Sequence, residues 1–302
     1  MENATSSPEY PPDAGTWELS AVIYVAVCLF VLFVIHGSME RRGRMKWSKL
    51  RWEHVAESSR GCSTSCMAVW RFFCCVLVIL NNVVMVFVSD SASKLVAGGF
   101  IVFATFTVWS WTLIGVYMGL AGAVSLASAC KSTPRQGCAS VLPCRIIWLL
   151  FEVMLPVSFL IFLLVWLVLL PAAYHTSGTA MGLFTPPALA AHNLNFVFMF
   201  IEALVNRLCI TTYHLIFIFY YGGLYVIFSW IFFAFQHFFF YFFIDWRYPL
   251  VLIGYSGLLC MLTTFFFIGR SIVNCVKPPL YTWDLDESES EESELESASC
   301  TE

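Results

Sequence analysis

Long runs of hydrophobic residues, separated by short polar segments, dominate this chain of 302 residues. An α-helix needs about 20 apolar residues to cross the hydrocarbon core of a bilayer. Seven runs approach or exceed that length, and each is bounded by charged or turn-forming residues. The pattern therefore predicts an all-α fold, a multi-pass transmembrane helical bundle of about seven spans, at residues 17–35, 67–88, 96–120, 146–173, 188–206, 211–235 and 249–268.

The composition agrees with this prediction and excludes a soluble domain. Hydrophobic residues make up 59% of the chain and charged residues only 12%, whereas soluble domains carry about 25% charged residues. The formal net charge of −4 comes from an acidic C-terminal segment, and the body before it is mildly basic. We find no nucleic-acid-binding signature, so the expected surroundings and partners are membrane lipids.

The placement of Lys and Arg predicts the orientation, because positively charged loops stay in the cytoplasm. Most basic residues fall in alternate loops, beginning with the loop 37–66, and almost none fall in the loops between. This places the N-terminus outside and the C-terminus in the cytoplasm. The basic residues of the first loop are Arg41, Arg42, Arg44, Lys46, Lys49, Arg51 and Arg60.

Two terminal segments differ in composition from the spans. Residues 1–16 form an extracytoplasmic segment in which Asn3 begins a glycosylation sequon, although such sequons are common by chance. Residues 271–302 contain a Ser- and Glu-rich stretch that predicts a disordered acidic cytoplasmic tail. Its serines are either phosphorylation sites or part of a solvated tail without a specific role.

The twelve cysteines show no spacing typical of a metal site. Several of them, such as Cys74 and Cys260, lie inside apolar runs, where a thiol acts as a small packing residue. We therefore expect no disulfide framework, no metal and no cofactor.

The stretch 188–207 looks like a membrane helix but carries His192, Asn195, Glu202 and Asn206. At 3.6 residues per turn these positions share one face, and Met199 fills the gap in that face. Polar groups are costly in hydrocarbon. The face should therefore point toward protein, water or a substrate.

Charged residues in the cytoplasmic halves of the spans suggest an ion pair. Arg71, Glu202 and Glu152 are predicted at similar depths, and neither sign of charge is easily tolerated alone in a membrane. We assign Arg71 and Glu202 a structural ion pair in preference to a catalytic role. Glu152 either joins this pair or extends its carboxylate to the cytoplasmic interface.

The outer halves of the spans carry a candidate for catalysis. A threonine hydroxyl needs a nearby base to act as a nucleophile, and His192 is the histidine best placed to serve one. Thr107 and Thr105 diverge on their helix, so only one of them faces the bundle. The simpler interpretation is that the threonines bond their own backbone and His192 links two helices.

The spacing His192-x2-Asn195-x6-Glu202, the following YHLIFIFYYGGLYVIFSWIFF and DWRYPL, and FATFTVWSW resemble the rolling-stone proteins of the androgen-induced-protein superfamily. The resemblance covers about residues 70–270. It divides the chain into an extra N-terminal span with its basic loop (17–66) and a six-span family core (67–270).

Some members of this superfamily are membrane threonine hydrolases that cleave fatty acid esters of hydroxy fatty acids. The resemblance implies Thr107 as the nucleophile and His192 as the base, acting on a lipid ester. Asn195 would orient His192 or donate a hydrogen bond to the oxyanion. The alternative is a non-enzymatic protein of the plasma membrane or an endomembrane, whose polar face binds a lipid or a partner.

Overall fold

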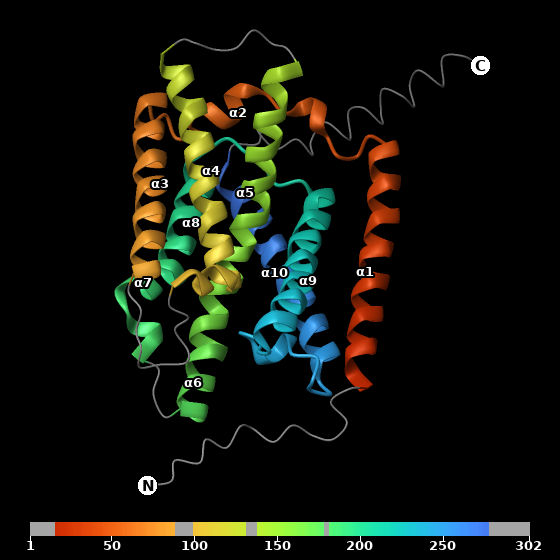
Figure 1. Ribbon diagram of the computed structural model, residues 1–302. Helices are drawn as coiled ribbons and strands as arrows, with labels where there is room; N and C mark the ends of the chain where they lie inside the picture. Colours follow the sequence, from red (N-terminus) through yellow and green to blue (C-terminus); the bar gives the residue numbers. More distant parts are fainter. Residues whose placement is uncertain (1–15, 88–98, 131–137, 178–180, 278–302) are drawn as a thin grey trace, which may run out of the picture. The chain divides into compact units, whose positions relative to one another are not determined.

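The computed structural model describes residues 16–87, 99–130, 138–177 and 181–277, and over these ranges most of the chain is helical (Figure 1). Seven helices are long and apolar enough to cross a membrane, so the chain is a multi-pass integral membrane protein. The seven spans run over Trp17–Arg41, Thr64–Phe87, Phe106–Ala129, Leu142–His175, Pro186–Val205, Thr212–Gln236 and Val251–Val276. The predicted all-α fold with seven spans is confirmed.

Five spans contain one α-helix each, the sixth with the 3-10 turn η6 (Thr212–His214) before it, and two are composite. The single helices are α1 (Thr16–Arg41), α3 (Thr64–Phe87), α4 (Phe106–Ala129), α9 (Leu215–Gln236) and α10 (Val251–Val276). The fourth span joins α5 (Cys138–Leu164), the π-helix η3 (Val165–Leu169) and α6 (Leu170–Ser177). The fifth joins α7 (Pro186–Leu189), the π-helix η5 (Ala190–Leu194) and α8 (Asn195–Val205).

Short elements connect the spans. The helix α2 (Trp52–Ala56) follows the first span, together with the 3-10 turn η1 (Trp47–Lys49). The other 3-10 turns are η2 (Gly99–Ala104), η4 (Met181–Phe184), η6 (Thr212–His214) and η7 (Phe242–Ile244).

The third span begins about ten residues later than the hydropathy pattern predicted. Residues 99–104 form the turn η2, and Thr105 caps α4 by accepting a hydrogen bond from the amide of Val108. The helix then continues to Ala129 through a segment of small residues. Small residues contribute little hydropathy, so the apolar run alone misplaced this helix along the chain.

The chain divides into two compact units, which we describe separately. Unit 1 comprises Met1–Arg44 and Leu215–Thr264, and unit 2 comprises Met45–His214 and Phe265–Glu302. Within unit 1, α1 packs against α9. The hydroxyls of Tyr24 and Ser256 are 2.8 Å apart and join α1 to α10.

The aromatic segment before α10 belongs to unit 1 and is held in it by contacts between aromatic rings. The ring centroids of Phe233 and Phe239 are 4.6 Å apart, and the guanidinium of Arg247 lies 5.0 Å from the Phe233 ring centre. Arg247 also forms an ion pair with Asp245. Gly254 is required here because a Cβ would lie 2.2 Å from the carbonyl oxygen of Phe243.

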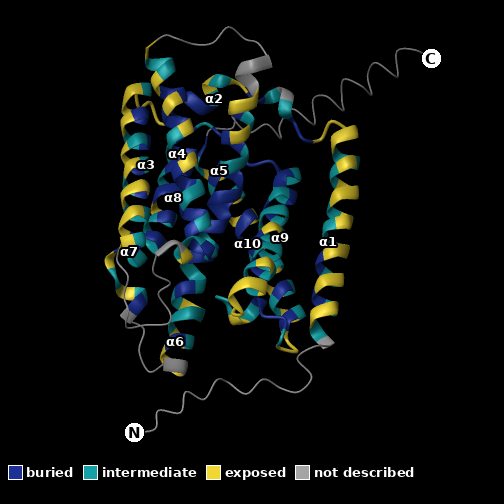
Figure 2. Cartoon of the chain, in the orientation of Figure 1, coloured by how far each residue is buried: buried dark blue, intermediate teal, exposed yellow. Residues whose placement is uncertain are grey.

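In unit 2, α3 and α4 pack closely because glycines on α4 meet side chains of α3. A Cβ on Gly115 would lie 2.7 Å from Val78, and one on Gly122 would lie 3.3 Å from Arg71 and Phe72. Small residues at such positions let two membrane helices approach each other. Much of α4 and α5 is buried, whereas α3 has an exposed outer face (Figure 2).

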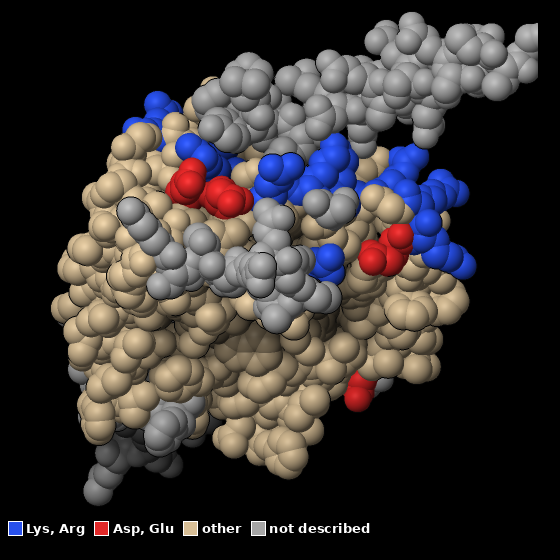
Figure 3. All heavy atoms as spheres, turned by 90° about the horizontal axis from the view of Figure 1, so that it is seen from above, with Lys and Arg blue, Asp and Glu red and all other residues tan. Residues whose placement is uncertain are grey.

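One end of unit 2 carries α2 and is rich in basic residues. Arg51 and Arg60 are exposed there, and Figure 3 shows Lys and Arg gathered on the corresponding face. We call this the basic end. The positive-inside rule assigns it to the cytoplasm.

Candidate functional site

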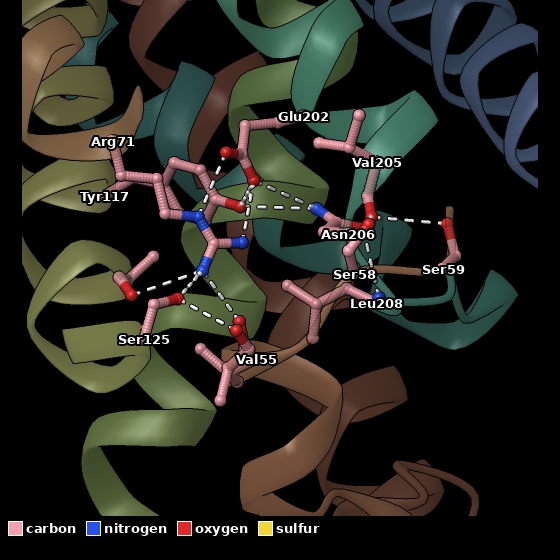
Figure 4. Close-up of polar contacts among 12 residues, drawn as sticks. Val55, Ser58, Ser59, Arg71, Tyr117, Ser125, Glu202, Val205, Asn206 and Leu208 are labelled. Carbon is pink, nitrogen blue, oxygen red and sulfur yellow. Dashed lines mark hydrogen bonds and ion pairs between the residues drawn. The ribbon is translucent and has the colours of Figure 1, made fainter. Parts of the chain in front are cut away.

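Two groups of polar side chains lie inside unit 2, one toward the basic end and one toward the opposite, outer end. Their hydrogen bonding differs. The first is joined by a continuous network, which Figure 4 shows. The second contains buried atoms that lack partners.

Arg71 is the centre of the first group. It lies on α3, is fully buried, and forms a bidentate ion pair with Glu202 of α8, with both N–O distances at 3.0 Å (Figure 4). Its third nitrogen donates to the hydroxyl of Ser125 at 2.7 Å and to the carbonyl of Val55 at 2.8 Å. A bidentate pair whose remaining donors are satisfied is the form in which a buried charge is tolerated.

Glu202 has further donors around it. The Tyr117 hydroxyl donates to its carboxylate at 2.8 Å, and the Asn206 amide donates to the Tyr117 oxygen at 3.3 Å. Asn206 directly follows the last residue of α8 as its C-cap. Its side-chain oxygen accepts from the amide of Leu208 at 3.1 Å and from Lys277 at 2.7 Å.

Lys277 completes this group from the end of α10. It is 3% exposed, donates to Asn206 and to the carbonyl of Leu208, and lies 5.4 Å from the centre of the Phe151 ring. Burial lowers the pKa of Lys277 to about 7. We call Arg71, Tyr117, Ser125, Glu202, Asn206 and Lys277 the basic-end network.

Glu152 does not join Arg71 and does not extend to the interface, so both sequence interpretations were wrong. It is fully buried on α5 and accepts from the amide of Thr211 at 2.6 Å and bonds Nδ1 of His214. Nε2 of His214 donates to the carbonyl of Met45 at 3.0 Å. His214 lies 62 residues from Glu152 in the chain, so only the fold brings these two side chains together.

His192 and Asn195 are the predicted members of the outer group, and a π-helix shapes their surroundings. His192 lies within η5, and Asn195 begins α8. The neighbouring fourth span contains the second π-helix, η3. The indole of Trp166 in η3 donates to Asn193 in η5 at 3.0 Å, so the two irregular segments are linked. Single π-turns inside α-helices occur frequently at functional sites.

Four side-chain atoms of the outer group are buried and lack a hydrogen-bond partner among the described residues. They are carried by α3, α4, η5 and α8, and η5 packs against the other three. We call their residues the outer polar group. The atoms are Oδ1 of Asn82, Nε1 of Trp111, Nδ1 of His192 and Nδ2 of Asn195.

Thr107 is buried in the first turn of α4, where its exposed fraction is 6%. Because α4 begins at Phe106 and not at residue 96, Thr107 lies close to the outer end of the helix. The element that carries His192 packs against α4. No hydrogen bond joins Thr107 to His192 in the part of the chain that the structure describes.

Thr105 takes no part in the outer group. Its hydroxyl donates to the carbonyl of Val102 at 2.9 Å and accepts from Val108, so it serves as the cap of α4. Thr112 bonds to the amide of Asn82 at 3.1 Å and fixes this side chain.

The described residues contain no group of three or more His, Cys, Asp or Glu side chains that could hold a metal ion. No protein-family model, curated protein or solved structure matches the chain.

Proposed function

We propose that this integral membrane protein binds the polar part of a lipid-like amphiphile in the outer half of unit 2, through His192 and Asn195. The observation that carries the proposal is the outer polar group itself. A buried polar atom without a partner costs about 1–3 kcal/mol, and water is absent from the hydrocarbon core to satisfy it. A ligand that supplied the missing partners would remove this cost.

The unpartnered atoms indicate what the ligand must offer. Asn195 and Trp111 present N–H donors, and Asn82 presents an acceptor. The neutral imidazole of His192 can take either role at Nδ1. A group that combines a carbonyl oxygen with a hydroxyl, as in a monoacylglycerol, supplies both partners, while its acyl chain remains in the bilayer.

Photolabelling tests this proposal. Membranes containing the full chain are treated with a monoacylglycerol that carries a diazirine and an alkyne, and labelling is compared among variants. We expect His192→Phe and Asn195→Leu each to lower labelling about tenfold, because one hydrogen bond in a dry site contributes about 1.4 kcal/mol. Thr264→Val, which removes an exposed hydroxyl bonded to its own helix, is the control and should label normally. Equal labelling of all four proteins would refute the proposal.

A second candidate is the threonine lipid esterase that the resemblance to the androgen-induced-protein superfamily implies. Two observations favour it: Thr107 is buried in the first turn of α4, and η5 packs against α4. Thr107 would attack the ester carbonyl and His192 would accept its proton. Asn195 Nδ2 would donate to the oxyanion. Catalytic hydrogen bonds are often formed only with substrate bound.

A fluorophosphonate probe separates the two candidates, because it reacts with an activated hydroxyl and not with a binding site. Catalysis predicts labelling of the wild type that Thr107→Ala abolishes. If the wild type and Thr107→Ala label equally, or neither labels, the esterase candidate is rejected, whatever the outcome of photolabelling.

A further inference from the structure

The side-chain amide of Asn82 is held at one end and unpartnered at the other. Its nitrogen donates to the hydroxyl of Thr112 at 3.1 Å, and this bond joins α3 to α4. Its oxygen is buried and has no hydrogen-bond partner among the described residues. An amide nitrogen is a donor and an amide oxygen is an acceptor. The bond to Thr112 therefore decides that the atom left for a ligand is an acceptor.

Neighbouring contacts bring this amide to the rest of the outer polar group. The side-chain amide of Asn81, on the same helix, donates to the carbonyl of Pro187 at 3.2 Å and ties α3 to α7, directly before η5. The ring of Trp111 on α4 stacks on that of Phe198 on α8, with centroids 5.6 Å apart. Thus α3 and α4 both contact the fifth span beside the amide.

The amide lies inside the apolar part of the bundle. Asn82 is five residues before the last residue of α3, and Trp111 is five residues after the first residue of α4. At 1.5 Å per residue, both lie about 7.5 Å from the outer ends of their helices. The described residues in the outer halves of the spans of unit 2 include no Lys, Arg, Asp or Glu. A charged head group at this depth would have no counter-ion, which is costly.

We infer, on the basis of the lipid binding proposed for His192 and Asn195, that Asn82 and Thr112 determine its specificity. They make the site select neutral amphiphiles that carry a hydrogen-bond donor beside a carbonyl group. The ligand carbonyl accepts from the unpartnered N–H groups of Asn195 and Trp111, and the ligand donor binds the oxygen of Asn82. Thr112 is a positioning residue, because it acts through Asn82.

A ligand that has a carbonyl but no donor would leave the oxygen of Asn82 buried and unpartnered. A site built to hydrogen-bond a hydroxyl or an N–H group rejects an analogue that lacks it, because its own polar atom then stays unsatisfied. Fatty acid methyl esters are such analogues. Monoacylglycerols and primary fatty amides both carry the donor, although their head groups differ in shape.

The alternative is that the bond between Asn82 and Thr112 only joins two helices. A contact of that kind would alter the stability of the protein and its affinity for every ligand alike. It would not alter the ratio between the affinities for two ligands that have the same acyl chain. This ratio is therefore the quantity to measure.

Competition during photolabelling of the full chain in membranes measures the ratio. The probe is the monoacylglycerol that carries a diazirine and an alkyne, and the competitors have one acyl chain in common. They are a monoacylglycerol, a primary fatty amide, a methyl ester and a lysophosphatidic acid, each given as a mole fraction of the membrane lipid. In the wild type, the methyl ester and the charged lysophosphatidic acid should need about ten times the mole fraction of the other two for half-maximal competition.

Two variants test whether this preference comes from the amide. Asn82→Leu removes the acceptor, and Thr112→Val lets the amide rotate and present its nitrogen. Each should reduce the preference for the fatty amide over the methyl ester from about tenfold to about threefold or less. Thr264→Val, which removes an exposed hydroxyl bonded to its own helix, is the control and should keep the full preference.

The outcomes separate this specificity from the lipid binding on which it depends. Labelling that His192→Phe does not lower refutes the lipid binding and the specificity together. Labelling that depends on His192 but is competed equally by all four lipids overturns the specificity alone. A preference that persists unchanged in both Asn82→Leu and Thr112→Val also overturns it, because the amide would then have no part in the selection.

Discussion

The two polar groups of unit 2 occupy the same bundle but differ in how their hydrogen bonds are satisfied. In the basic-end network, the guanidinium of Arg71 has partners at each of its three nitrogens, and the Glu202 carboxylate accepts from Arg71, Tyr117 and Asn206. In the outer polar group, one polar atom each of His192 and Asn195 is buried without a partner. A satisfied network stabilises a fold, whereas unsatisfied atoms are tolerated where something else binds.

The helices around the two groups also differ, in the regularity of their backbone. The residues of α4 that surround the network are regular helix, packed through glycines against α3. The outer group is bordered by two π-helices, η3 and η5, whose hydrogen bonds depart from the α pattern. Regular packing at one end agrees with a stabilising role for the network, and irregular backbone at the other end agrees with the ligand binding that we propose for the outer polar group.

The largest effect should follow from breaking the ion pair at the centre of the basic-end network. Glu202→Leu leaves the buried guanidinium of Arg71 without its counter-ion. Removing one partner of a buried pair costs about 3–5 kcal/mol. We expect a large loss of thermal stability in detergent, measured by the melting temperature of purified protein, together with poor membrane expression.

The control for this experiment is the double variant Arg71→Met/Glu202→Leu. It removes both charges, so it should regain most of the stability that Glu202→Leu loses. A double variant no more stable than the single one would contradict the assignment of a paired, mainly structural role.

Lys277 should make the stability of the network depend on pH. Its folded-state pKa of about 7 lies below the ordinary 10.5, so between these values the unfolded chain binds more protons. The free energy of unfolding should therefore rise with pH in this window, by at most about 1.4 kcal/mol per unit. Lys277→Met should abolish that rise in melting curves recorded from pH 7 to 9. Parallel pH profiles of the melting temperature in the wild type and in Lys277→Met would contradict this prediction.

Gly115 lies on α4 between the two groups and should show how much they depend on a common helix contact. In Gly115→Ala the new methyl group would lie 2.7 Å from Val78 Cγ1 and 3.1 Å from its Cβ. Overpacking of this kind costs about 1–3 kcal/mol. We expect a lower melting temperature that Val78→Ala partly restores in the double variant. Equal melting temperatures of Gly115→Ala and the wild type would contradict this prediction and would show that α3 can shift away from α4 to make room for the methyl group.

Hydropathy and charge pattern predicted much of this structure. Seven apolar runs gave seven helices because backbone in lipid must satisfy its own hydrogen bonds. The pairing of Arg71 with Glu202 followed from the cost of isolated charge in a membrane, and the structure contains that pair. Both predictions rest on large free-energy costs, that of unsatisfied backbone groups in lipid and that of an isolated charge in a membrane. These costs exceed the small local preferences of single residues.

Other features depended on three-dimensional contacts that the sequence does not reveal. The helix α4 begins where Thr105 caps it. Its last residues are small and contribute little hydropathy, so the apolar run does not reveal where the helix ends. The pairing of Glu152 with His214 needs two spans brought together around Met45. The π-helices η3 and η5 have no periodicity that distinguishes them from ordinary α-helix, although they shape the surroundings of His192.

The smallest effect on stability is expected at the outer polar group, and this contrast is the sharpest test of the comparison. His192→Phe and Asn195→Leu replace atoms that lack partners, so neither should lower the free energy of unfolding by more than about 1 kcal/mol. A monoacylglycerol at about 100 times its dissociation constant should stabilise the wild type by about 2.7 kcal/mol. It should stabilise each variant by only about 1.4 kcal/mol at that concentration, because a tenfold loss of affinity leaves the lipid at about 10 times the variant's dissociation constant. Melting curves with and without the lipid measure both quantities. If His192→Phe destabilises the protein as strongly as Glu202→Leu, the outer group is a structural lock like the network, and the distinction between them fails.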